Sequence, residues 1–178
     1  QVVRAFEDKN ITHVDGSIDP KRDAETINTE LALADLETVS KRFDNLSREM
    51  KAGKTKDLEI LLASLERAKE ALSKGIMLRD LEWNEDEEKQ LKSLNLLTKK
   101  PMLYVVNVSE AQLGDDSWKG EVEELNGELV PVCVKMEADM MDMSDEEKKE
   151  YLEMTGQSES GLSRLIKAGY KLLGLITF

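Results

Sequence analysis

The sequence predicts an α/β fold in which a parallel sheet is interrupted by a pair of long helices. Short apolar runs rich in β-branched residues alternate with amphipathic segments, which is typical of parallel strands joined by helical crossovers. Two adjacent segments carry apolar residues at steps of three and four, as in helices that pack side by side. The length of 178 residues allows one domain or a small pair of domains.

Three apolar runs are the predicted strands: residues 1–6 (QVVRAF), 102–106 (MLYVV) and 130–134 (VPVCV). Pro131 weakens a fully central position for the third run, because proline donates no hydrogen bond to a neighbouring strand. Three strands are few for a doubly wound sheet, so we expect either a missing remainder or an unusually small sheet. Both chain ends stand in apolar runs, and we expect them to be internal positions of a longer protein.

The two long helices are predicted between Pro20 and Gly75. The first apolar seam comprises Leu36, Val39, Phe43, Leu46 and Met50, and the second comprises Leu58, Leu61, Leu65, Ala68 and Leu72. Gly53 and Gly75 are the predicted ends of the two helices. A turn of a few residues then joins them into an antiparallel hairpin.

Shorter helices are predicted over residues 85–94, 117–125, 144–154 and 160–170. Asn84 precedes the first as a helix cap, and Ser144 with Glu147 forms a capping box at the third. These helices alternate with the strands, as a parallel sheet requires.

Charge and cysteine content exclude several classes of protein. The net charge is −12, and residues 115–153 carry fourteen acidic against four basic side chains. Binding to nucleic-acid phosphates needs clustered lysine and arginine, so the charge does not support direct nucleic-acid binding by this segment. No apolar run is long enough to cross a membrane. The single cysteine, Cys133, stands among apolar residues, which indicates a reducing compartment, and we predict a cytoplasmic protein without a membrane partner.

Two groups of residues after predicted strands are candidates for ligand binding. Asn107-Val108-Ser109-Glu110 follows the second strand, at the carboxyl end where open parallel sheets bind ligands. Val134-Lys135-Met136 ends the third strand. From the residues alone, a turn capped by Asn107 and a simple strand end are the more economical interpretations.

His13 is the chain's single histidine and stands in a predicted loop. Imidazole suits proton transfer or water orientation near neutral pH, although a lone loop histidine is usually inert. Gly53-Lys54-Thr55 has the ending of a phosphate-binding loop, but position 48 is Arg48 rather than glycine. We therefore interpret that segment as the hairpin turn.

Four long strings carry a resemblance to a known family: RAFEDKNITHVDGSIDPKRDAETINTELALADLE, KPMLYVVNVSE, VPVCVKMEAD and SGLSRLIKAGYKLLGLITF. In this order they closely resemble the YchF or Obg-like ATPase family of translation-factor-class P-loop NTPases. Family members also have a GxxNVGKS phosphate loop, a DxAG switch and a TGS domain, which this chain lacks. The resemblance implies the C-terminal half of a P-loop G domain, an α/β parallel-sheet fold, with an inserted antiparallel α-helical coiled coil.

The resemblance also implies a division of the chain. Residues 1–24 would be a strand and loop of the G domain, and residues 25–98 the inserted helical coiled-coil domain. Residues 99–171 would be the C-terminal part of the G domain, and residues 172–178 the truncated start of the TGS domain.

The same resemblance assigns roles to individual residues. Asn107 and Val108 match the adenine-contacting positions of the family's NxxE motif, and Glu110 matches the acid that replaces the guanine-reading aspartate of other G domains. His13 matches the histidine of the family's NI-x-HV motif, proposed to assist hydrolysis where other GTPases use a glutamine. The second base-side loop is matched by Val134, Lys135 and Met136.

The resemblance implies a nucleotide-binding protein that hydrolyses ATP, or GTP, with Mg²⁺ and that acts with ribosomes or the translation machinery. The phosphate and Mg²⁺ ligands are expected in the missing N-terminal part, so the 178-residue chain is not expected to be an active hydrolase alone. The alternative is a non-enzymatic interaction module, in which the helical hairpin binds a protein or ribosomal partner and the α/β part supports it.

Overall fold

The computed structural model describes residues 1–7 and 17–176. Its strands are β1 (Val2–Arg4), β2 (Leu103–Asn107) and β3 (Glu128–Val132). Its α-helices are α1 (Pro20–Ala52), α2 (Lys56–Ser73), α3 (Glu85–Leu91), α4 (Glu110–Asp115), α5 (Lys119–Val122), α6 (Val134–Asp139), α7 (Asp145–Met154) and α8 (Gly161–Leu172). None of the described helices is long and apolar enough to cross a membrane. The chain divides into two compact units, the first formed by Gln1–Ala24 with Met102–Phe178 and the second by Glu25–Pro101.

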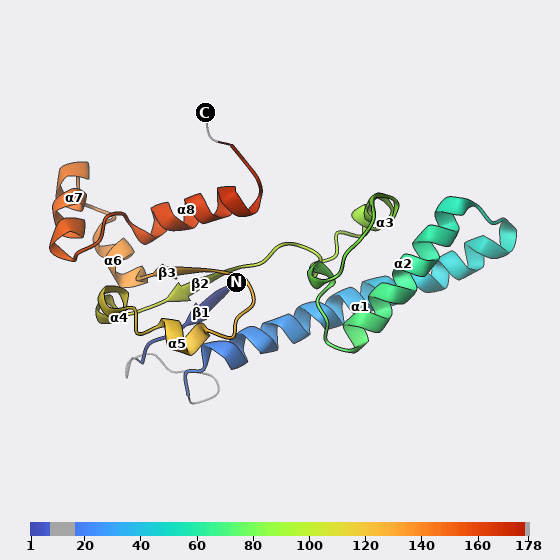
Figure 1. Cartoon of the computed structure of the whole chain (residues 1–178), viewed down its shortest axis with the longest axis horizontal. Helices are drawn as coiled ribbons and strands as arrows, with labels where there is room; N and C mark the ends of the chain where they lie inside the picture. The colour runs from blue at the N-terminus through green and yellow to red at the C-terminus, as the bar shows by residue number, and fades with distance from the viewer. Residues whose placement is uncertain (8–16, 177–178) are drawn as a thin grey trace. The chain divides into compact units, whose positions relative to one another are not determined.

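The strands of the first unit form a parallel sheet in the order β1-β2-β3 (Figure 1). Asn107 at the end of β2 lies opposite Arg4 on one side and Val132 on the other, so the three strands end at the same level. Pro131 lies in β3, an outer strand of this sheet, where a missing backbone N–H is tolerated. The α/β class and the parallel sheet predicted from the sequence are confirmed.

Helices cover both faces of this sheet. Tyr104 of β2 is buried against one face with Leu113 of α4 and Val122 of α5. Val105 points to the opposite face and packs in a cluster with Ala168 of α8. The alternation of sides along β2 follows from the two-residue repeat of a strand. Because helices cover both faces, the carboxyl edge of the sheet is where polar side chains can remain accessible to a ligand.

The second unit is built on α2 and on the part of α1 that follows residue 24. The two helices contribute to one apolar cluster, in which Val39, Leu46 and Leu65 are completely buried. These residues belong to the two predicted seams, so the seams form the core of this unit. Burial of each such side chain contributes about 1.5–3 kcal/mol to folding.

Helix ends follow the predicted signals. α1 ends immediately before Gly53, and Gly75 after α2 has a left-handed backbone (φ +74°), with its N–H donating to the carbonyl of Leu72 at 3.0 Å. Asn84 and Ser144 each accept the N3 backbone N–H of the helix that follows, in capping boxes.

The elements around the second and third strands differ from those predicted. β3 covers Glu128–Val132 rather than residues 130–134, and the residues from Val134 onward form α6. Helix α4 was not predicted, and α5 covers Lys119–Val122 rather than residues 117–125. Helices of one or two turns are too brief to show a periodic apolar pattern, which explains these differences.

A buried carboxylate organises the polar part of the second unit. Asp35 on α1 is 3% exposed, and its oxygens accept from the backbone N–H of Leu97 at 2.8 Å and of Thr98 at 2.7 Å. The hydroxyl of Thr98 also donates to Asp35, at 2.6 Å, and the carbonyl of Thr98 accepts the backbone N–H of Arg79 at 3.0 Å. A buried charge is tolerated only when donors surround it, so this network fixes residues 97–98 against α1.

We predict that Asp35→Ala lowers the free energy of unfolding by about 3 kcal/mol, because three donors, two of them buried, lose their acceptor. Urea unfolding followed by circular dichroism measures the change, and hydrogen exchange should show faster exchange of the Leu97 and Thr98 amides. Asp44→Ala, at an exposed position of the same helix, is the control and should change stability by less than about 0.5 kcal/mol. Equal effects of the two substitutions would contradict the assigned role of Asp35.

Candidate functional site

The carboxyl ends of β2 and β3 bring the two predicted ligand-binding segments together. Asn107 and Val132 are register partners at the ends of neighbouring strands. The N–H of Val108 donates to the carbonyl of Val132 at 3.0 Å, which carries the strand pairing one residue further. Residues 107–110 and 133–136 therefore start from adjacent points of the sheet edge, where parallel α/β sheets bind their ligands.

Asn107 connects the three strand ends. Its backbone carbonyl accepts the N–H of Ala5, just beyond β1, at 2.9 Å, and its side-chain Oδ1 accepts the N–H of Val134 at 3.3 Å. Cys133, the N-cap residue of α6, forms no side-chain cap, so Asn107 supplies an acceptor at the start of that helix. This bond orients the amide, since Oδ1 must face the Val134 N–H, and leaves Nδ2 without an acceptor among the described residues.

Two of the predicted base-contacting side chains belong to the core. Val108 is 1% exposed and Met136 is 3% exposed, and both lie in the apolar cluster beneath the sheet edge. They can offer a ligand only their backbone groups. Val134 is 51% exposed, so it is the apolar surface residue of this group.

Glu110 and Lys135 form an ion pair across the two segments. Glu110 lies in the first turn of α4, Lys135 lies at the start of α6, and Nζ of the lysine is 2.9 Å from Oε1 of the glutamate. The pKa of Lys135 is raised, first by the hydrogen bond to Glu110 and its charge and then by the negative charge of Asp139. The pKa of Tyr151 on α7 is raised by burial and by the charges of Glu110 and Asp139.

Sequence reasoning missed Asp139 and Tyr151 as neighbours of this edge. Asp139 lies four residues after Lys135, one turn along α6. A helix prediction over residues 134–139 would have indicated that proximity, but the segment was interpreted as a strand end. Tyr151 lies on α7, eleven residues after Met140, the C-cap of α6, and no local pattern could have placed it.

The start of α4 is fixed by its capping box. Ser109 Oγ accepts the N–H of Gln112, and Gln112 Oε1 accepts the N–H of Ser109 at 3.0 Å. Gln112 Nε2 donates in turn to the carbonyl of Ala5 at 2.5 Å. Glu110 is therefore carried by a helix start that is tied to the end of β1.

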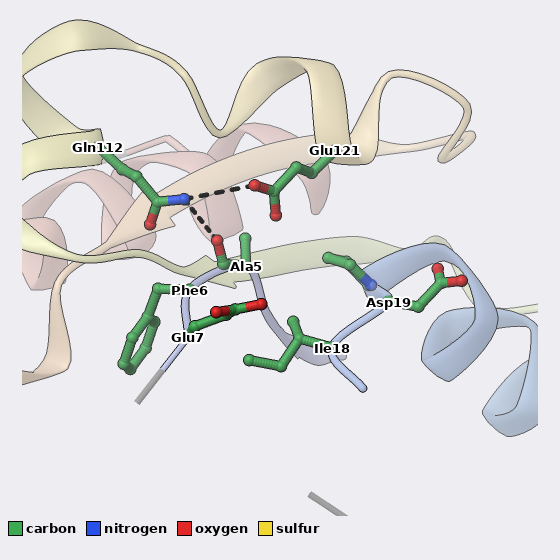
Figure 2. A pocket seen from close by; sticks show the side chains of 8 residues that line it. Ala5, Phe6, Glu7, Ile18, Asp19, Gln112 and Glu121 are labelled. Carbon is green, nitrogen blue, oxygen red and sulfur yellow. Dashed lines mark hydrogen bonds between the residues drawn. The ribbon is translucent and has the colours of Figure 1, made fainter. Parts of the chain in front are cut away.

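A cavity of about 460 Å³ lies beside the hydrogen bond from Gln112 to Ala5, at the carboxyl end of β1. Figure 2 shows the side chain of Gln112 placed between the carbonyl of Ala5 and the carboxylate of Glu121. Glu121 is an exposed residue, and partial desolvation beside the cavity raises the pKa of its carboxyl, with the negative charge of Glu7 as the second cause. The lining residues are Ala5, Phe6, Glu7, Ile18, Asp19, Pro20, Gln112 and Glu121.

The predicted catalytic residue, His13, lies outside the described residues. Its role therefore stays a prediction.

Comparison with known proteins identifies relatives of the whole chain. The chain is 46% identical to the ribosome-binding ATPase YchF of Bacillus subtilis over 184 residues, and 41% identical to that of Escherichia coli over 181 residues. Each alignment covers 99% of this chain and 50% of the relative. The chain is homologous to YchF proteins over almost its whole length.

The fold agrees with this homology. The solved structure of the Schizosaccharomyces pombe YchF GTPase superposes with a TM-score of 0.80 at 31% identity, over 97% of this chain and 49% of that chain. No protein-family model matched the sequence. The resemblance to the YchF family stated from the sequence is confirmed, and the chain spans about half the length of the YchF relatives that it matches.

We predict that Glu121→Gln raises the free energy of unfolding at pH 7. The pKa of Glu121 in the folded chain lies above its ordinary value of 4.5, so the ionised carboxylate disfavours folding at neutral pH. This penalty decreases as the pH falls through the pKa of the folded chain. The gain in unfolding free energy from Glu121→Gln should therefore vanish by about pH 4. Urea unfolding at the two pH values measures the difference.

Glu123→Gln is the control for the loss of one negative charge. Glu123 lies two residues away and is exposed, as Glu121 is, but it does not line the cavity. A gain for Glu121→Gln that is equal at both pH values, or that Glu123→Gln reproduces, would contradict the account of this carboxylate.

Proposed function

We propose that this chain forms the base-binding part of a YchF-type nucleotide hydrolase that prefers ATP to GTP. One observation carries the proposal. At one edge of the sheet, Asn107 accepts a hydrogen bond from Val134 and Glu110 forms an ion pair with Lys135. The homologues named ribosome-binding ATPase YchF and the neighbour named YchF GTPase support the same activity.

Adenine recognition follows from the groups at this edge. Adenine presents an exocyclic amine donor beside a ring-nitrogen acceptor. Asn107 Nδ2, which has no acceptor among the described residues, is the donor for the ring nitrogen. Val108 stands where other G domains have a lysine, and its buried side chain supports the floor of the site without adding charge.

Hydrolysis would need parts that this chain does not contribute. Phosphoryl transfer depends on positioning and on charge neutralisation at the phosphates, which a phosphate loop and Mg²⁺ supply in P-loop NTPases. Within residues 1–7 and 17–176 no three or more His, Cys, Asp or Glu side chains gather as a metal-binding group. We propose that Mg²⁺ binds with the nucleotide phosphates and that His13 orients the attacking water.

We further propose that the protein acts in the cytoplasm with ribosomes, as the names of its relatives suggest. The helical hairpin of α1 and α2 is proposed to be the inserted coiled coil of the family and to contact the ribosome. Residues 115–153 are strongly acidic, so a protein surface is a better partner for that region than RNA.

Titration of the ¹⁵N-labelled chain with AMP, followed by NMR, tests the base site. We expect millimolar binding with shifts at residues 107–110 and 133–136, because the chain holds the base without a phosphate loop. Asn107→Ala should weaken binding about fivefold, the effect of one lost hydrogen bond.

Asn126→Ala, at an exposed loop position of the same unit, is the matched control and should leave the affinity unchanged. Absence of shifts at the sheet edge would contradict the base site. Binding of a ribosomal partner without nucleotide binding would instead favour the interaction module.

For His13 we predict a loss of turnover without a loss of affinity. In a longer protein that joins this chain to a phosphate loop, His13→Ala should slow ATP hydrolysis about a hundredfold and leave the nucleotide Kd nearly unchanged. Single-turnover hydrolysis and equilibrium binding separate the two quantities. Equal turnover in the variant and the parent would remove His13 from the site.

A further inference from the structure

We propose that Lys135 biases the site toward adenine and against guanine, by holding the carboxylate of Glu110 in an ion pair. This inference rests on the proposed base-binding function of the same edge. The pair joins the two segments that flank Asn107, with Nζ of Lys135 at 2.9 Å from Oε1 of Glu110.

The chemistry of the bases explains why this pair would discriminate. Guanine presents two neighbouring N–H donors on its Watson–Crick edge, and a free carboxylate accepts both. Adenine presents one donor and a ring-nitrogen acceptor there, which a carboxylate repels. A carboxylate that already accepts a lysine ammonium is a poorer acceptor for guanine and repels the ring nitrogen of adenine less, so the pair shifts the preference toward adenine.

Both members of the pair are held in place by their own helix starts. The Ser109–Gln112 capping box fixes the first turn of α4, which carries Glu110. The bond from the Val134 N–H to Asn107 fixes the first turn of α6, which carries Lys135. Asp139, one turn further along α6, adds a second negative charge that favours the ammonium at this position.

The size of the effect follows from the exposure of the pair. The side chains of Lys135 and Glu110 are 75% and 43% exposed, and exposed ion pairs are weak and screened by salt. We therefore expect a change of about fivefold in base preference rather than an inversion by orders of magnitude.

The test is NMR titration of the ¹⁵N-labelled chain with AMP and with GMP, comparing the ratio of the two affinities. The ratio cancels any general weakening of phosphate attraction when a lysine is removed. Lys135→Met should strengthen GMP binding relative to AMP binding about fivefold. Adding Glu110→Gln to Lys135→Met should abolish that gain, because no carboxylate is left to read guanine.

Lys119→Met is the matched control. This substitution breaks an exposed ion pair of the same unit, in which Nζ of Lys119 lies 2.6 Å from Oδ2 of Asp116. It removes one positive charge, as Lys135→Met does. An unchanged ratio in Lys135→Met, a gain that persists with Glu110→Gln, or an equal gain in Lys119→Met would each overturn the proposal. Shifts at the sheet edge with AMP but an unchanged ratio would overturn this inference alone, whereas no shifts with either nucleotide would overturn the base site as well.

Discussion

The pairing of β2 with a parallel neighbour on each side is the constraint on which the candidate site depends. The register places Arg4, Asn107 and Val132 at one level, so the segments that follow three distant parts of the chain begin side by side. Asn107 then uses both its backbone and its side chain to bind the neighbouring strand ends. A shift of one residue in this register would turn the side chain of Asn107 to the other face of the sheet.

The carboxylates of Asp35 in the second unit and of Glu110 in the first unit have different surroundings. In the second unit, Asp35 is buried and accepts hydrogen bonds from three protein donors. At the sheet edge of the first unit, Glu110 is partly exposed and receives one lysine ammonium that water can reach. A buried, fully satisfied network stabilises a fold, whereas an exposed pair can be exchanged for a ligand. This contrast supports the sheet edge as the place of function.

Much of the fold could be predicted from local patterns. The seams of α1 and α2, the glycines that end them, and the caps at Asn84 and Ser144 follow from spacing and side-chain chemistry within a few residues. The end of β3 and the start of helix α6 could not be predicted in this way, because Val132-Cys133-Val134 is an uninterrupted apolar run with no local stop signal. The helix begins there because Asn107, twenty-seven residues earlier, accepts the N–H of Val134.

The sequence named candidate residues at the sheet edge, but it could not predict the contacts between them. Asn107, Glu110 and Lys135 were identified through position and resemblance, whereas the pair between Glu110 and Lys135 depends on the β2–β3 register and on α6 being a helix. The proximity of Tyr151 depends on how α7 packs, which is a tertiary property. Gly161 shows the same dependence, because a Cβ there would lie 2.9 Å from Val132 Cγ1, a contact that no local pattern reveals.

Photoaffinity labelling with an 8-azidoadenine nucleotide, followed by peptide mapping, tests the central claim most directly. The account predicts that label is incorporated in residues 103–110 and 128–139 and that excess AMP prevents it. Label confined to residues 25–101, or label that AMP does not displace, would contradict a base site at the carboxyl edge of β2 and β3.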